Sequence, residues 1–137
     1  MVTIQVRYAG NKKCDLKHQE GPTLRTDAPK DIGGEASAFS PTDMVAGALA
    51  SCILTTIAMY AERHGLNIDG ATAGVEKHMI TPPAPPPRRI GRLPVAVTLP
   101  ASVPAEWREK LEKVGHTCPV HASLHPDVDS PISYRYV

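Results

Sequence analysis

Residues 39–65 read FSPTDMVAGALASCILTTIAMYAERHG, and this stretch decides the fold. Ser40 can cap a helix that begins at Pro41, because serine accepts a hydrogen bond from the first turn and proline suits the first helical position. Asp43, three residues after the cap, can complete a capping box and complement the helix dipole. Gly65 is typical of the left-handed residue that ends a helix. The pattern predicts one long helix that begins at Pro41 and runs to the residue before Gly65.

This helix is apolar on almost every side. Between Met44 and Ala61 the aliphatic hydroxyl residues are only Ser51, Thr55 and Thr56, and no charged side chain occurs. A stretch of that length could cross a membrane, but it is rich in Ala and Gly rather than Leu and Phe, and polar, strand-like sequence surrounds it. We therefore expect the central helix of a soluble domain, without a membrane partner.

One chain of 137 residues offers little material to cover such a helix. Small side chains along the helix would let a second backbone approach closely, and the formal charge of only +1 leaves little repulsion between copies. These small residues are Ala46, Gly47, Ala48, Ala50, Ala58 and Ala61. We expect residues 1–137 to form a single domain that pairs into an intertwined homodimer.

The flanking sequence predicts strands on both sides of the helix and two further helices. Val2, Ile4, Val6 and Tyr8 alternate with polar residues, which indicates a half-buried strand. Strands are predicted at residues 2–9, 14–18, 23–26, 71–80, 90–99 and 132–137, helices at 104–114 and 118–124, and an extended proline-rich connection at 82–87. The order is that of an α+β fold with antiparallel sheets.

Charge and composition exclude several classes of protein. Lys plus Arg number 15 against 14 for Asp plus Glu, so we expect no nucleic-acid partner. The cluster formed by Arg88, Arg89 and Arg92 lacks interleaved aromatic residues and is typical of a solvated face. The first seven residues alternate like a strand and lack the apolar core of a secretion signal, and three cysteines are a poor framework for a secreted disulfide scaffold. We therefore expect a cytoplasmic protein.

The three cysteines differ in their local sequence. Cys52 lies in the middle of the long helix, where it gains nothing from the helix dipole, and a buried free cysteine often acts as a small apolar residue. Cys118, within the stretch HTCPVH, falls at the start of a short helix beside two imidazoles, which favours the thiolate. Local sequence thus favours Cys118 as the reactive thiol. Cys14, beside two lysines on an early strand, is expected to be structural or a bystander.

A metal site is an alternative for the C-terminal segment. His116, Cys118, His121 and His125 lie within ten residues, and a short helix could bring some of them together. The segment has neither a paired CxxC nor an HExxH motif, which makes a zinc site the weaker interpretation. We expect no metal.

Two segments resemble the OsmC / organic hydroperoxide resistance family, in its OsmC-like branch. FSPTDMVAGALASC, residues 39–52, is similar to the family's first-cysteine helix, and HTCPVHASL, residues 116–124, is similar to its second-cysteine segment. Gly33-Gly34, Arg88-Arg89-Ile90 and the order of elements fit as well. The resemblance covers most of the chain and implies an OsmC-like fold with a long central helix that bears a cysteine.

The resemblance implies a function in oxidative or osmotic stress defence. In this family the first cysteine attacks a hydroperoxide and the second resolves the product, so Cys52 and Cys118 are the expected catalytic pair of a peroxiredoxin-like peroxidase. The resemblance further implies an obligate dimer with two active sites at its interface, a dithiol reductant of the lipoyl or thioredoxin type, and no bound cofactor.

The sequence departs from the family pattern around the first cysteine. Characterised members place a glutamate ten residues before it, where this chain has Thr42. That glutamate holds an arginine that polarises the thiolate. Lys13 and Arg25 are the candidate cations here, and Asp43 and His121 are further supporting residues. A second hypothesis follows from the missing glutamate: a redox-responsive or small-ligand-binding dimer of the same fold without turnover.

Overall fold

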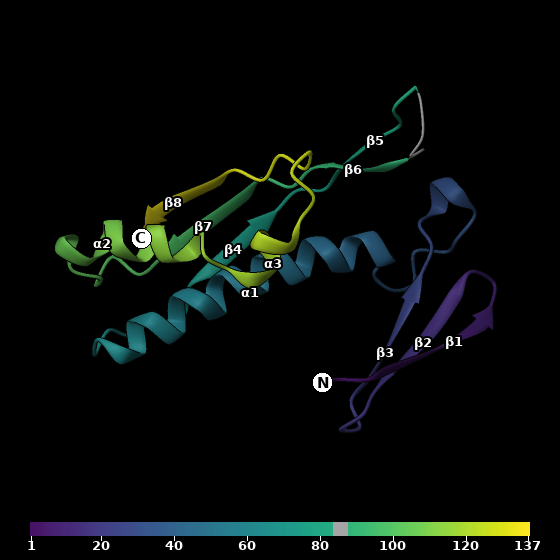
Figure 1. The fold of residues 1–137 in the computed structure, drawn as a ribbon, viewed down its shortest axis with the longest axis horizontal. Helices are drawn as coiled ribbons and strands as arrows, with labels where there is room; N and C mark the ends of the chain where they lie inside the picture. Colours follow the sequence, from purple (N-terminus) through teal and green to yellow (C-terminus); the bar gives the residue numbers. More distant parts are fainter. Residues whose placement is uncertain (84–87) are drawn as a thin grey trace. The chain divides into compact units, whose positions relative to one another are not determined.

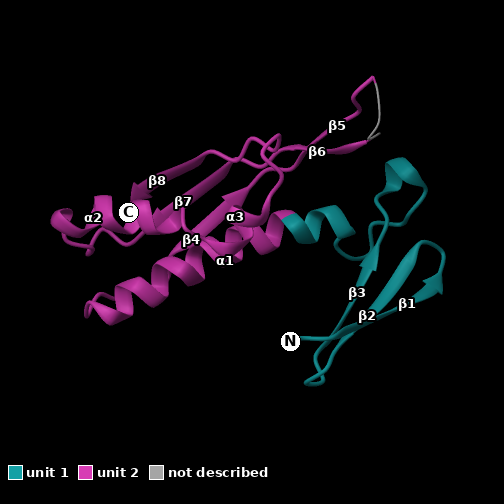
Figure 2. Ribbon diagram, viewed as in Figure 1, with its two compact units in different colours: residues 1–45 teal, residues 46–137 magenta. Residues whose placement is uncertain are grey.

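The computed structural model describes residues 1–83 and 88–137, shown in Figure 1. The described chain divides into two compact units, residues 1–45 and residues 46–137 (Figure 2). Helix α1, Pro41–Arg63, begins in unit 1 and runs on into unit 2. Each unit is described below by itself.

Unit 1 is an antiparallel meander of three strands, as the alternation predicts. These strands are β1 (Ile4–Gly10), β2 (Lys13–His18) and β3 (Thr23–Asp27), in the order β1-β2-β3. Asn11 and Lys12 make the first turn with φ of 52° and 61°, the left-handed conformation that matches a hairpin turn to the strand twist. The loop that follows contains a short 3₁₀ helix, η1 (Lys30–Ile32).

One side of this sheet is apolar and exposed. Val6 pairs with Leu16, and Leu16 pairs with Leu24, so the three side chains form one row across the strands. Val6 is 61% exposed and Leu24 48%, and Tyr8, on the same side, is 65% exposed. An apolar sheet face of this extent is typical of a surface that associates with another chain.

Helix α1 begins and ends as the sequence predicts. The Asp43 backbone N–H donates to Ser40 Oγ at 3.1 Å, and the Ser40 N–H donates to Asp43 Oδ2 at 2.9 Å, which completes a capping box. Gly65, with φ of 68°, terminates the helix. The residues buried on one face, at helical spacing, are Ala46, Leu49, Ala50, Ile53, Ile57 and Ala61.

Unit 2 places a mixed sheet against the buried face of α1. Strand β4 (Thr72–Val75) is antiparallel to β7 (Val95–Leu99), and β8 (Ile132–Tyr136) is parallel to β7 on its other side. The parallel pair was not anticipated, because it joins strands that are far apart in sequence. Leu49, Ile53 and Ile57 of α1 share one core cluster with alternate residues of β7. By length and mean hydropathy (1.8) α1 would also pass as a membrane span, but this packing is that of a core helix.

Two predicted strands are each divided in the structure. Residues 71–80 form β4 and β5 (His78–Ile80), and residues 90–99 form β6 (Arg89–Arg92) and β7. Pro94 lacks a backbone N–H and interrupts the second stretch between β6 and β7. Strands β5 and β6 pair as a separate antiparallel hairpin. Of the extended connection predicted at 82–87, residues 84–87 lie outside the described residues.

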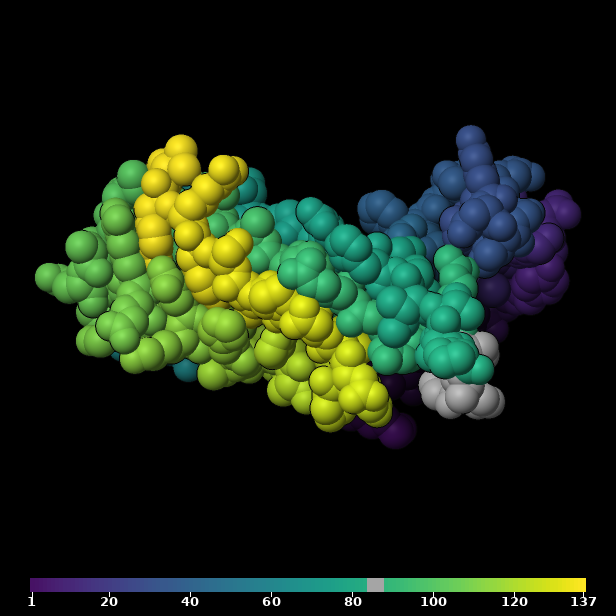
Figure 3. Space-filling model, turned by 90° about the horizontal axis from the view of Figure 1, so that it is seen from above, coloured from purple at the N-terminus to yellow at the C-terminus, as the bar shows by residue number. Residues whose placement is uncertain are grey.

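Two helices lie between β7 and β8 in the sequence. They are α2 (Ala105–Gly115) and α3 (Pro119–Ser123), close to the predicted bounds. The Tyr134 hydroxyl of β8 donates to the carbonyl oxygen of Glu112 at 3.1 Å, and Leu111 on α2 is fully buried. In the space-filling view the C-terminal residues (yellow) lie against α2 (green) (Figure 3). This packing fixes the end of α2, from which the second cysteine follows.

Candidate functional site

The structure brings Cys52 and Cys118 together within unit 2. Cys52 lies midway along α1, and Cys118 is the residue that precedes α3. Both are free thiols, and each lies close enough to shift the pKa of the other. Cys118 is fully buried, whereas Cys52 is partly exposed. The two sulfur atoms are thus neighbours, with Cys52 the more accessible.

A tight turn between α2 and α3 positions Cys118. The Thr117 hydroxyl donates to the carbonyl oxygen of Val114 at 2.7 Å, and the Cys118 N–H donates to the carbonyl oxygen of Gly115 at 3.4 Å. Pro119 then starts α3, where its fixed φ suits a first helical position. The backbone of Cys118 is therefore held by the turn that precedes it and by the helix that follows it.

The surroundings of Cys52 favour its ionised form. Burial works against ionisation, but hydrogen bonds outweigh it. The thiol of Cys118, the backbone N–H of Val120 and the hydroxyl of Thr56 all donate to the Cys52 sulfur. Together they lower the pKa of Cys52 below its ordinary value of 9.0. Cys52 is therefore equipped to act as a nucleophilic thiolate.

The surroundings of Cys118 have the opposite effect. Burial raises the pKa of the Cys118 thiol, and the hydrogen bond that it donates to Cys52 raises it further. The N–H groups of His121 and Val120 lower the pKa, but they do not compensate for these effects. The argument from local sequence, which favoured Cys118 as the more acidic thiol, is therefore wrong, because it could not include burial or the neighbouring sulfur.

The histidines of the C-terminal segment do not converge on a metal site. His121 Nε2 lies 3.3 Å from the carbonyl oxygen of Ser130. The centroids of the His116 and His121 rings are 6.0 Å apart, with the rings edge to face. His125 Nδ1 lies 3.7 Å from Asp127 Oδ2. Within residues 1–83 and 88–137 no group of three or more His, Cys, Asp or Glu side chains could hold a metal ion.

Lys13, a predicted supporting residue, lies in unit 1 between two carboxylates. Its Nζ is 3.6 Å from Asp27 Oδ2 and 3.3 Å from Glu35 Oε2. Asp27 is fully buried and accepts hydrogen bonds from the hydroxyl and the N–H of Ser37, at 2.6 Å and 2.9 Å. These bonds, with Lys13, lower the pKa of Asp27 to about 2. Within unit 1, Lys13 therefore links Asp27, at the end of β3, to Glu35 in the loop between β3 and α1.

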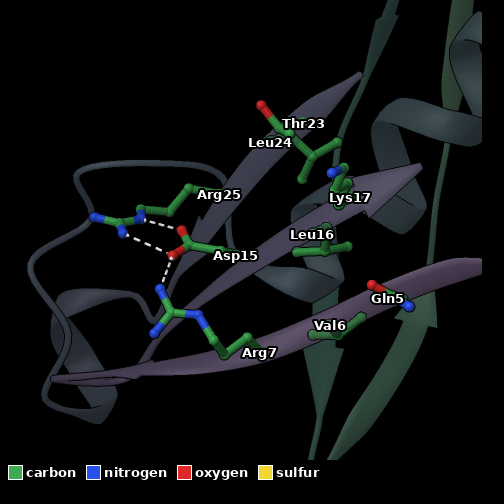
Figure 4. Close-up of a pocket in the computed structure, with 9 residues that line it drawn as sticks. All are labelled: Gln5, Val6, Arg7, Asp15, Leu16, Lys17, Thr23, Leu24 and Arg25. Atoms are coloured by element: carbon green, nitrogen blue, oxygen red, sulfur yellow. Dashed lines mark hydrogen bonds and ion pairs between the residues drawn. The ribbon is translucent and has the colours of Figure 1, made fainter. Parts of the chain in front are cut away.

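Arg25, the second candidate cation, is also engaged within unit 1. Its Nε donates to Asp15 Oδ1 at 2.6 Å and its Nη2 donates to Asp15 Oδ2 at 3.0 Å, while Arg7 Nη2 donates to the same Oδ2 at 3.0 Å. Figure 4 shows the three side chains meeting, and they help to line a cavity of about 860 Å³. The hydrogen bonds from Arg25 lower the pKa of the Asp15 carboxyl. The excess of positive charge makes this surface basic.

Asp43 and Cys14 also belong to unit 1. The Asp43 carboxylate accepts the Ser40 N–H in the capping box, the structural role that its position predicted. Cys14 is partly exposed on β2, where it pairs with Tyr8 on one side and Thr26 on the other.

Sequence reasoning missed two groups that donate to Cys52. Thr56 follows Cys52 by four residues, one helical turn, so its position on the same face was available from the sequence. The Val120 N–H could not be found in this way, because it depends on how α3 packs against α1.

Comparison with known proteins identifies the fold and the family. A family model described as OsmC-like protein matches residues 34–132. A crystal structure of a putative osmotic stress induced and detoxification response protein from Psychrobacter arcticus 273-4 shares 36% sequence identity, with 98% of this chain and 96% of that chain covered and a TM-score of 0.88. No curated protein matches the sequence.

Two more distant structures share the fold. An organic hydroperoxide resistance protein OsmC from Legionella pneumophila is 18% identical, with 100% of this chain and 97% of that chain covered and a TM-score of 0.80. The organic hydroperoxide resistance protein OhrB of Bacillus subtilis is 16% identical, with 98% of both chains covered and a TM-score of 0.72. With a family model across most of its length and a relative at 36% identity, this chain belongs to the OsmC-like family.

Proposed function

We propose that this protein is a thiol peroxidase that reduces organic hydroperoxides through Cys52 and Cys118. The observation that carries the proposal is the proximity of the two free thiols, each of which shifts the other's ionisation, so that the pKa of Cys52 is lowered and that of Cys118 is raised. A lowered pKa raises the share of the nucleophilic thiolate, and a second thiol beside it supplies the means of resolution.

The cycle has three steps. The Cys52 thiolate attacks one oxygen of ROOH and breaks the O–O bond; Cys52 becomes a sulfenic acid, and the alkoxide takes up a proton and leaves as the alcohol. Cys118 then attacks the Cys52 sulfur, which forms a disulfide and releases water. A dithiol of the lipoyl or thioredoxin type reduces the disulfide by thiol–disulfide exchange and is itself oxidised. None of these steps requires a metal or a bound cofactor.

Organic hydroperoxides are the preferred substrate class because the surroundings of Cys52 are apolar. Cys52 packs against the core cluster that includes Ile53, and Leu54 and Leu124 pack against the same cluster. An alkyl or aryl group would gain from burial there, whereas hydrogen peroxide would not. The names of the related structures, organic hydroperoxide resistance and detoxification response, support a role in stress defence.

A homodimer that acts in the cytoplasm is part of the same proposal. The apolar face of the unit 1 sheet and the outer side of α1, where Ser51, Thr55 and Met59 are exposed, both suit contact with a second copy. We propose that the two units work as one domain in this dimer.

Steady-state assays test the peroxidase function directly. Consumption of cumene hydroperoxide is compared with that of hydrogen peroxide, with dihydrolipoamide as reductant. Cys52→Ser should abolish turnover, and Cys118→Ser should leave a sulfenic acid on Cys52 that a dimedone reagent traps. Cys14→Ser is the matched control and should retain activity. Turnover that survives in Cys52→Ser would refute the proposal.

A second candidate is a redox-responsive or ligand-binding dimer without turnover. It is favoured by Thr42 at the position of the family glutamate, and by the groups that lower the pKa of Cys52, which in the described chain are hydrogen-bond donors rather than charged side chains. It predicts one disulfide per oxidising equivalent and no catalysis when dithiol is supplied.

A further inference from the structure

The polar side of the unit 1 sheet carries an excess of positive charge. Side chains alternate between the two sides of a strand, so the residues in register with Arg7 lie on the side opposite to the apolar row that contains Val6. Two cross-strand rows of this polar side line the cavity shown in Figure 4: Arg7, Asp15 and Arg25 in one row, and Gln5, Lys17 and Thr23 in the other. The two rows hold three cations and one carboxylate, a net charge of +2.

The cavity is a trough between these two rows. Val6, Leu16 and Leu24 also line it; they lie between the rows in the sequence and pair with one another across the strands. Because their side chains belong to the other side of the sheet, the strands themselves form the floor of the trough. The two rows are two residues apart along each strand, or roughly 7 Å. A group that lies in the trough is therefore flanked by polar side chains on both sides.

Asp15 holds the two guanidinium groups of the first row in place. Its carboxylate accepts hydrogen bonds from two N–H groups of Arg25 and one of Arg7, and each guanidinium carries further donors that Asp15 does not use. The Arg7 side chain is 75% exposed and that of Arg25 50%, so a ligand can approach both. Arginines that are ordered in advance lose less side-chain entropy when they bind an anion.

We propose that the trough between the two rows binds the phosphate group of a small soluble phosphate ester. A phosphate monoester carries a charge of about −2 at neutral pH, which complements the net charge of the rows. Its terminal oxygens point in several directions, so they can accept hydrogen bonds from the guanidinium groups of one row and from the Lys17 ammonium and Thr23 hydroxyl of the other. A carboxylate has only two oxygens, in one plane, and a single guanidinium satisfies both.

The size of the trough indicates a ligand larger than a phosphate ion. Its volume of about 860 Å³ lies within the range of roughly 300–1,000 Å³ that is typical of sites for small organic molecules. The aliphatic stems of Arg7, Lys17 and Arg25 offer apolar surface to the organic part of the ester. None of the nine lining residues is a cysteine, so this binding site is separate from the proposed peroxidase chemistry.

Titration of the intact protein, followed through its backbone amide signals by nuclear magnetic resonance, tests the site. The probes are phenyl phosphate, inorganic phosphate and benzoate, each added at neutral pH and constant ionic strength. We expect phenyl phosphate to shift the amides of β1, β2 and β3 in a saturable way, and at lower concentrations than either of the other two probes. Inorganic phosphate lacks the organic part, and benzoate replaces the phosphate by a carboxylate on the same ring.

Three variants relate the binding to the trough. Arg25→Gln should weaken phenyl phosphate binding about tenfold, because it removes a charged donor. Since this change also alters the partners of Asp15, Lys17→Gln is the second variant; Lys17 is exposed, and its loss should weaken binding several-fold without disturbing the sheet. Lys30→Gln is the matched control. It removes the same charge from an exposed position in unit 1 that does not line the trough, and affinity should stay within about twofold of the parent.

The proposal is overturned if phenyl phosphate produces no saturable shift, or if Lys17→Gln binds it as tightly as Lys30→Gln does. Benzoate or inorganic phosphate that binds as tightly as phenyl phosphate would also contradict it. Vesicles that contain phosphatidic acid present the same group on a lipid surface, and protein that binds these vesicles but not phenyl phosphate would refute a soluble ligand. Because no measurement involves turnover, failure of the peroxidase assay would leave these results unchanged.

Discussion

The Tyr134 hydroxyl occupies the space that a side chain on Gly115 would need. A Cβ built on Gly115 would meet the Tyr134 hydroxyl oxygen within the van der Waals distance, and it would also lie 3.2 Å from Cδ1 of Ile57. Strand β8, the end of α2 and helix α1 therefore approach one another closely at this glycine. Cys118 follows three residues later, so the same contact sets where the second thiol emerges.

Gly115→Ala should therefore destabilise the protein. Because the added methyl group must displace Tyr134 or Ile57, we expect a loss of about 1–3 kcal/mol in the free energy of unfolding, measured by urea titration. Gly74→Ala is the matched control, since a Cβ there meets nothing within 4 Å. If the two variants unfold at the same urea concentration, the close approach at Gly115 is not a constraint on stability.

The sequence predicted α1 well because its signals are local. Ser40, Asp43 and Gly65 act within one turn of the helix ends, and each makes the contact that its position implied. The break between β6 and β7 also has a local cause, because Pro94 lies between the two strands. The parallel pairing of β8 with β7 depends on packing between residues far apart in the chain, and no local pattern encodes it.

The sequence indicated which two cysteines form the candidate site, but it did not indicate the electrostatics of the pair. The cysteine pair was recognisable from its two flanking segments. Which thiol is more acidic was not, because the answer depends on the burial of Cys118 and on donors from α3 and Thr56 that meet Cys52 only in the folded chain. Lys13 was predicted to be an activating cation from its position in the sequence. Its partners Asp27 and Glu35 could not be predicted, because the fold of the loop that carries Glu35 brings them together.

Asp27 should make stability depend on pH in the acid range. Its folded pKa of about 2 lies below the ordinary 3.8, so its contribution is fully present above about pH 4 and is lost as pH falls through 2. We expect Asp27→Asn to be strongly destabilised at pH 7 and progressively less so, relative to the parent, toward pH 2. Urea unfolding at a series of pH values measures the difference. Glu20→Gln, which removes an exposed charge from unit 1, should show no comparable trend, and a constant difference for Asp27→Asn would exclude this linkage.

Formation of the Cys52 sulfenic acid should follow the ionisation of Cys52. Because its pKa is lowered from 9.0 and the thiolate is the nucleophile, the second-order rate with cumene hydroperoxide should rise with pH through a midpoint below pH 9. Stopped-flow measurement in Cys118→Ser isolates this step, and glutathione under the same conditions supplies the profile of an ordinary thiol. A midpoint at or above that of glutathione would argue against an activated Cys52.

A charge placed on the outer side of α1 should separate the proposed dimer. Ala48 is exposed on that side of the helix, between the small residue Gly47 and the buried Leu49. In a dimer a glutamate there would be buried without a partner, so we expect Ala48→Glu to sediment as a monomer at concentrations where the parent is dimeric. Ala101→Glu makes the same change at an exposed turn after β7 and should leave the sedimentation coefficient unaltered. Dimers in both variants would mean that the second copy docks elsewhere, and the apolar face of the unit 1 sheet, with Val6 and Leu24 as the substituted positions, would then be the surface to probe.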